Sequence, residues 1–133
     1  MTVSWRGLHL LVGTLGLALF VLTGQYMQHM ANVPAMDDSL RLMYRSLHLY
    51  LLGACAGNVL VAVYMTPGRP LGWLRGTASA GLLLCAPLMA LSFFTEAAPG
   101  AMDRPLASVS MYLLFGAPVV LLLAEARDRF SAG

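Results

Sequence analysis

Basic and imidazole side chains recur at helical spacing in the stretch RLMYRSLHLYLL, residues 41 to 52. Arg41, Arg45 and His48 are four and three residues apart, so one face of a helix carries all three. A long apolar run begins at this point, and an ionisable residue beside such a run usually has a partner within the protein. These three side chains are therefore the first candidates for chemistry.

A heme site is one hypothesis for this face. Histidine and methionine together are a known axial ligand pair for heme iron. Met89 and Met111, in two later apolar runs, are expected in the same half of the protein as His48. The guanidinium groups of Arg45 and Arg41 suit the heme propionates, because guanidinium pairs well with carboxylate. The hypothesis is a b-type electron-transfer protein with heme b on His48 and on Met89 or Met111.

A copper site is a second hypothesis, carried by the stretch YMQHMANVPAM at residues 26 to 36. Met27, His29, Met30 and Met36 cluster here at the expected membrane surface. Soft thioether ligands together with imidazole suit Cu(I).

A polar clamp between helices is the alternative to both cofactor sites. In this interpretation Arg45 pairs with Glu96 or Asp37, and His48 bonds Gln25 or a backbone carbonyl. The clamp requires no cofactor, and it remains open beside the heme and copper hypotheses.

The elements that must position these residues are membrane helices. Of the 133 residues, 59% are hydrophobic and 11% are charged, which is far more apolar than a soluble domain of this size. A spanning helix needs about 20 apolar residues. Four segments qualify, at about residues 7 to 27, 45 to 65, 74 to 94 and 106 to 125. We expect a single transmembrane domain: an all-α, antiparallel up-down-up-down four-helix bundle with both termini on the same side.

The arginines give the expected orientation. Arg6, Arg69, Arg75, Arg127 and Arg129 fall on the side of the termini, and Arg41, Arg45 and Arg104 fall on the other side. The positive-inside rule therefore favours N- and C-termini in the cytoplasm. In a bacterial protein, the loop at residues 28 to 44 would then face the periplasm.

The spacing of small residues and the lack of acidic residues at the centres of the expected spans both bear on function. Small residues such as Gly13, Gly16, Gly53 and Gly57 lie at spacings of three and four and favour close helix contacts. The expected spans have no acidic residue at their centres, which argues against a transporter, and a net charge of +2 gives no reason to expect a nucleic-acid partner. We expect a protein without its own catalytic activity that contacts lipid and is an accessory or self-associating subunit of a membrane complex.

Three stretches carry a resemblance: LHLLVG at residues 8 to 13, LTGQYM at 22 to 27 and RLMYRSLHLY at 41 to 50. With them the chain resembles a group of small uncharacterised bacterial inner-membrane proteins, which implies a four-helix protein of the bacterial inner membrane and no established activity. In layout the chain is also similar to the small b-type cytochromes of that membrane. It departs from them by lacking histidines in the last two apolar runs.

Overall fold

Helices make up almost all of the described chain. The computed structural model describes residues 4–64, 72–97 and 103–131. Four α-helices and one 3-10 turn form within these ranges: α1 (Trp5–His29), η1 (Val33–Ala35), α2 (Asp38–Tyr64), α3 (Trp73–Thr95) and α4 (Pro105–Ser131).

All four α-helices are long and apolar enough to cross a membrane, and the spanning part of α4 is Pro105–Ala124. The prediction of an all-helical protein with four such helices is confirmed. The bounds differ most in α2, which begins at Asp38, seven residues before the expected residue 45. The Asp37 carboxylate explains the early start, because it accepts a hydrogen bond of 2.9 Å from the backbone N–H of Leu40 and caps the first turn. The expected end of this span, residue 65, lies outside the described residues.

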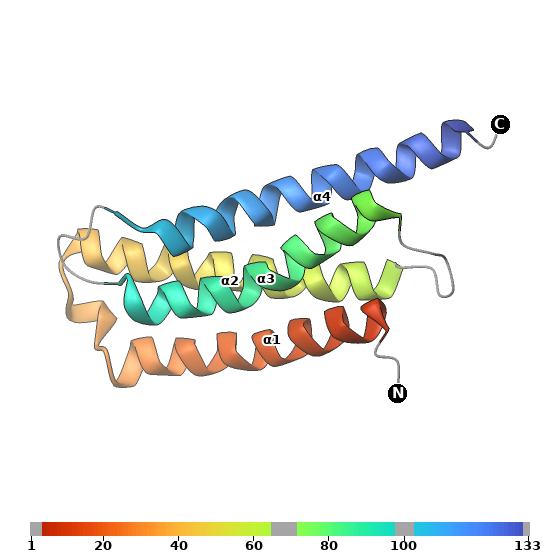
Figure 1. The fold of residues 1–133 in the computed structure, drawn as a ribbon. Coiled ribbons are helices and arrows are strands. Elements are labelled where there is room, and N and C mark those ends of the chain that lie inside the picture. The colour runs from red at the N-terminus through yellow and green to blue at the C-terminus, as the bar shows by residue number, and fades with distance from the viewer. Residues whose placement is uncertain (1–3, 65–71, 98–102, 132–133) are drawn as a thin grey trace.

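The helices are arranged with α2 and α3 in the middle and α1 and α4 on the outside (Figure 1). Helix α1 packs on α2 and α3, and α4 packs on α3 and over a shorter stretch on α2. Within the described ranges α1 and α4 do not touch. Accordingly, 44% of the residues in the most apolar window of α3 are buried, but only 17% in those of α1 and α4.

The core lies between α2 and α3, where Leu47, Leu51, Met89 and Phe93 are buried. Two glycines on α1 allow this helix to pack closely against the core. A Cβ added at Gly13 would lie 2.6 Å from Val59 Cγ2, and one added at Gly16 would collide with Cys55 Sγ. The small-residue face of α1 therefore packs against α2 inside the chain, as expected for close helix contacts in membranes.

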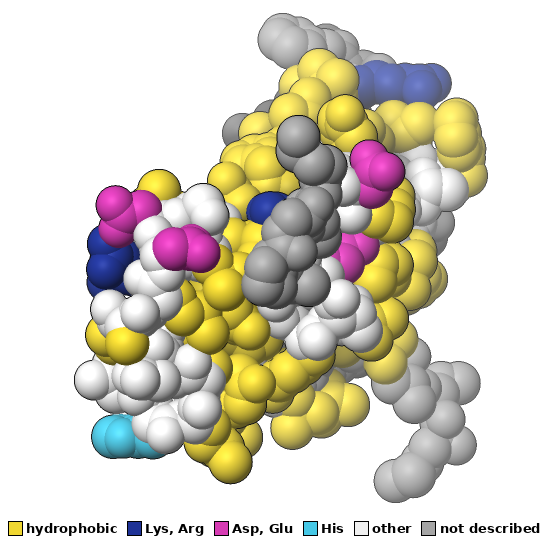
Figure 2. Space-filling view, turned by 90° about the vertical axis from the view of Figure 1, so that its left-hand side faces the viewer, with side chains coloured by type: hydrophobic (Ala, Val, Ile, Leu, Met, Phe, Trp, Pro, Cys, Tyr) yellow, Lys and Arg dark blue, Asp and Glu magenta, His cyan; other side chains and the backbone are white. Residues whose placement is uncertain are grey.

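Charged side chains gather at the end of the molecule where α2 and α4 begin. Figure 2 views this end, with acidic and basic side chains on it and hydrophobic side chains along the flanks. Such a distribution suits helices whose ends reach water and whose sides face lipid.

Candidate functional site

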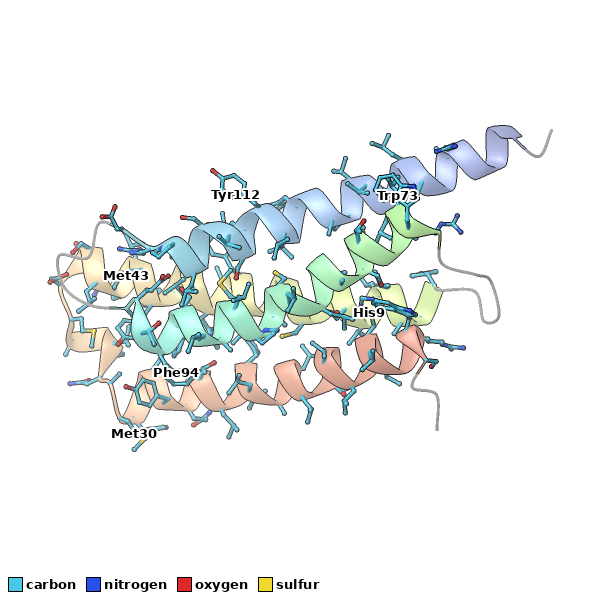
Figure 3. All side chains as sticks on the ribbon, viewed as in Figure 1. His9, Met30, Met43, Trp73, Phe94 and Tyr112 are labelled. Atoms are coloured by element: carbon cyan, nitrogen blue, oxygen red, sulfur yellow. The ribbon has the colours of Figure 1, made fainter. Side chains whose placement is uncertain are left out.

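A buried polar network joins three helices around His9. The Nδ1 atom of His9 on α1 lies 2.7 Å from Oδ1 of Asn58 on α2, and Nε2 of His9 is hydrogen-bonded to Oγ of Ser79 on α3. All three residues have an exposed fraction of 0%. In Figure 3 the His9 side chain points from α1 into the space between α2 and α3. The network is thus sealed from solvent and lipid.

The hydrogen-bond partners of Asn58 determine the tautomer of His9. The amide nitrogen of Asn58 donates to the carbonyls of Ala54 and Leu82, each at 2.9 Å. Its Oδ1 must therefore accept, so Nδ1 of His9 carries the hydrogen. In a neutral imidazole Nε2 is then the acceptor for the hydroxyl of Ser79. Each polar atom of the three side chains has a partner within the protein, which is the arrangement of an interhelical pin.

Arg6 adds a second contact at the same end of α1. Its Nε donates to the backbone carbonyl of Ala62 at 3.0 Å. Ala62 is in the last turn of α2, where carbonyls lack helical partners and attract positive charge. Arg6 therefore binds a carbonyl at the C-terminal end of α2, close to the His9 network.

His48 takes part in a separate contact with α1. Its Nδ1 lies 3.1 Å from Oγ1 of Thr23, and its ring is stacked on Phe20 with the centroids 4.0 Å apart. A Cβ added at Gly24 would lie 3.5 Å from Nε2 of His48. Both ring nitrogens of His48 thus face α1. The structure brings His48 to Thr23, and the clamp partner Gln25 is exposed.

His48, the histidine of the heme hypothesis, contacts α1 through both ring nitrogens in this packing. An axial ligand needs one ring nitrogen directed at the iron, and Nε2 of His48 lies against Gly24 instead. Met89 is fully buried in the core, and Met111 is half-buried. A heme on His48 would require α1 to move away from α2.

The arginines of this hypothesis lie at the surface. Arg41 forms an ion pair with Asp38, one helical turn away, and Arg45 is exposed. No described hydrogen bond or ion pair joins Arg41 or Arg45 to His48.

The residues of the copper hypothesis lie around the end of α1. Met27 and Met36 are half-buried, whereas His29 and Met30 are exposed. Met30 points away from the bundle in Figure 3. Within the described residues, no group of three or more histidine, cysteine or acidic side chains could hold a metal ion.

Glu96 takes a role that differs from the expected clamp with Arg45. Its carboxylate accepts hydrogen bonds from the backbone N–H groups of Leu106 at 2.8 Å and Ala107 at 2.9 Å, in the first turn of α4. The hydroxyl of Ser92 donates to the same carboxylate at 2.7 Å. Glu96 therefore ties the end of α3 to the beginning of α4 and supplies negative charge where the helix dipole favours it.

The charge of Glu96 is stabilised by these contacts. Partial burial raises the pKa of the Glu96 carboxyl, but the hydrogen bonds from Ser92, Ala107 and Leu106 and the positive charge of Arg104 outweigh burial and leave the pKa below its ordinary value. Asp37, the other proposed partner of Arg45, caps α2 instead. Its pKa is also lowered, first by the hydrogen bond from Leu40 and then by that from Ser39.

Sequence reasoning missed the partners Ser79 and Thr23 and the role of Glu96. The signal for His9 was available, since His9 precedes Gly13 and Gly16 on the small-residue face, and Asn58 is the polar residue near the middle of α2. Ser79 carries no comparable signal, because a serine is common in membrane helices and also bonds its own backbone.

Comparisons with protein-family models, with curated proteins and with solved structures found no match.

Proposed function

We propose that the protein is a small integral membrane protein without catalytic activity of its own that acts as an accessory or self-associating subunit of a membrane complex. The observation that carries the proposal is the use of the buried polar groups. His9, Asn58 and Ser79 bind one another, and within the described residues no buried side-chain nitrogen or oxygen lacks a hydrogen-bond partner. Polar groups used in this way hold helices together, and among the described residues these buried groups all have their partners within the protein.

The outer helices supply the surface for association. Helices α1 and α4 lie on opposite sides of the α2–α3 pair, and most of each faces outward (Figure 1). Gly116 on α4 is exposed, and a Cβ added there would meet no atom within 4 Å. An open glycine on an outer helix would let a neighbouring helix approach closely.

The proposed setting is the inner membrane of a bacterium, with an up-down-up-down order of helices and cytoplasmic termini. The contacts favour this order: His9, early in α1, meets Asn58, late in α2, whereas Thr23, late in α1, meets His48, early in α2. Arginine counts support the orientation. In intact cells a membrane-impermeant thiol reagent should label the Gln28→Cys variant and spare Arg127→Cys. The opposite pattern would reverse the orientation.

Purification of two differently tagged copies from one cell tests the association. Self-association predicts that each tag retains the other copy, and an accessory role predicts a second polypeptide in fixed proportion. Gly116→Leu on α4 and Ala18→Leu on α1 each enlarge an exposed position on one outer helix. Loss of the partner in one variant but not in the other would identify the interface. Recovery of a single copy alone would contradict the proposal.

A further inference from the structure

A groove of about 410 Å³ lies between α2 and α4. Its apolar lining consists of Leu47 from α2 and Ala107 and Met111 from α4. Leu47 and Ala107 are buried, so they form its floor. The volume is in the range of small-molecule sites, which begins at about 300 Å³. We propose that this groove binds one membrane phospholipid, with the phosphate on Arg104 and an acyl chain over the apolar floor. The inference does not depend on the function proposed above.

Among the described residues, no helix separates the groove from lipid at the side of the bundle. Helix α4 packs mainly on α3 and only briefly on α2, and within the described ranges α1 does not reach α4. A groove between α2 and α4 is therefore not covered by the remaining outer helix. The long axis of the groove runs along α4 and so along the membrane normal. Arg104 precedes the first residue of α4, and Met111 lies roughly 10 Å farther along the helix.

Polar groups line the mouth of the groove and suit a phosphate. Arg104 is half-buried and lies just before Pro105, where α4 starts. Guanidinium binds phosphate well, and its five N–H donors can serve more than one acceptor. The nearby Glu96 offsets part of this charge, but its carboxylate oxygens accept hydrogen bonds from Ser92 and the first turn of α4. Because its guanidinium has five N–H donors, Arg104 can bond a phosphate in addition to its partners within the protein.

Hydroxyl groups complete the lining. Ser108 is exposed one turn into α4, and Tyr50 and Ser46 approach from α2. Ser46 donates to the carbonyl of Met43 at 2.9 Å, so Ser108 and Tyr50 are the donors suited to a lipid phosphate or ester. Tyr112 lies on the outward side of α4 in Figure 3, as interfacial tyrosines do. Basic and hydroxyl groups above an apolar floor match a phospholipid rather than a wholly apolar ligand.

Native mass spectrometry of the full chain in mild detergent tests the site. The wild-type protein should retain one phospholipid per chain. Arg104→Gln removes the charge, and Ser108→Phe fills the groove from an exposed position; each should lower the bound fraction at least about fivefold. The matched control Arg45→Gln removes an exposed arginine that does not line the groove and should retain the lipid.

Four results would overturn the proposal: no adduct on the wild-type chain, an adduct that is not a phospholipid, equal loss in Arg45→Gln, or full retention in Ser108→Phe. Arg104 also lies beside the Glu96 cap, so thermal unfolding of Arg104→Gln is recorded alongside. If that variant unfolds, Ser108→Phe decides the question.

Discussion

His9 Nδ1 on α1 lies 2.7 Å from Asn58 Oδ1 on α2, fully buried, and Asn58 in turn donates to the carbonyl of Leu82 on α3. One amide therefore links three helices. Such a link should contribute to stability, because removal of one member leaves buried polar groups without partners.

Asn58→Ala should lower the free energy of unfolding by about 2 kcal/mol, since it leaves the buried His9 Nδ1–H unpaired and removes the hydrogen bond that joins α2 to the Leu82 carbonyl on α3. Thermal or denaturant unfolding in detergent measures the effect. A double-mutant cycle of His9→Ala and Asn58→Ala should give a coupling energy of about 1 kcal/mol. The control is Thr14→Ala, because exposed Thr14 bonds only carbonyls of its own helix. Equal effects of Asn58→Ala and Thr14→Ala would contradict the pin.

Gly16→Ala should destabilise the protein by about 1 to 3 kcal/mol, because the new Cβ collides with Cys55 Sγ and α1 must move from α2. Gly76→Ala on α3 makes the same chemical change where a Cβ meets nothing. It should be neutral or stabilising by up to about 1 kcal/mol, the usual difference between glycine and alanine within a helix. Unfolding midpoints compare the two variants. Similar midpoints would show that α1 and α2 are not in close contact at Gly16.

The Glu96 cap makes stability depend on pH. The pKa of this carboxyl is lower in the folded protein than its ordinary value of 4.5. Its contribution is therefore fully present above pH 4.5 and is lost as the pH falls through the folded pKa. Glu96→Gln should cost about 1 kcal/mol at pH 7 and weaken the loss of stability in acid.

Unfolding midpoints between pH 3 and pH 7 check the Glu96 prediction. Asp103→Asn is the control, because Asp103 is an exposed carboxylate close to the start of α4 that takes part in no described hydrogen bond. An unchanged acid profile in Glu96→Gln would assign the pH dependence to other groups.

The absorption spectrum after heme supplementation distinguishes the helix contact of His48 from heme ligation. Since both ring nitrogens of His48 face α1, we expect no Soret band. A band that persists in His9→Ala and disappears in His48→Ala would instead support the electron-transfer hypothesis. Copper analysis of wild type and Met30→Ala in the same preparation should give no bound metal in either.

The sequence predicts the long apolar helices well, because length and composition alone determine whether a helix can cross a membrane. It also predicts the close approach of α1, since Gly13 and Gly16 are three residues apart on one face. The hydrogen-bond partners of the carboxylates are not predicted as well. Opposite charge predicts that Glu96 or Asp37 pairs with Arg45, but in the structure the two carboxylates accept hydrogen bonds from backbone N–H groups of α4 and α2. The backbone N–H groups in the first turn of a helix compete with arginine side chains for a nearby carboxylate. Sequence spacing does not reveal which of these donors is better placed.

The mass of the particle extracted from the native membrane tests the central claim most directly. Native mass spectrometry of the full chain after removal of its tag, with a single-copy mass of 14.2 kDa, should give a multiple of that mass, apart from bound phospholipid, or a fixed stoichiometry with a second polypeptide. The outer-helix variant that disrupts association, Gly116→Leu or Ala18→Leu, should return the single-chain mass. A wild-type protein that is a lone 14.2 kDa chain under the mildest extraction would contradict the account.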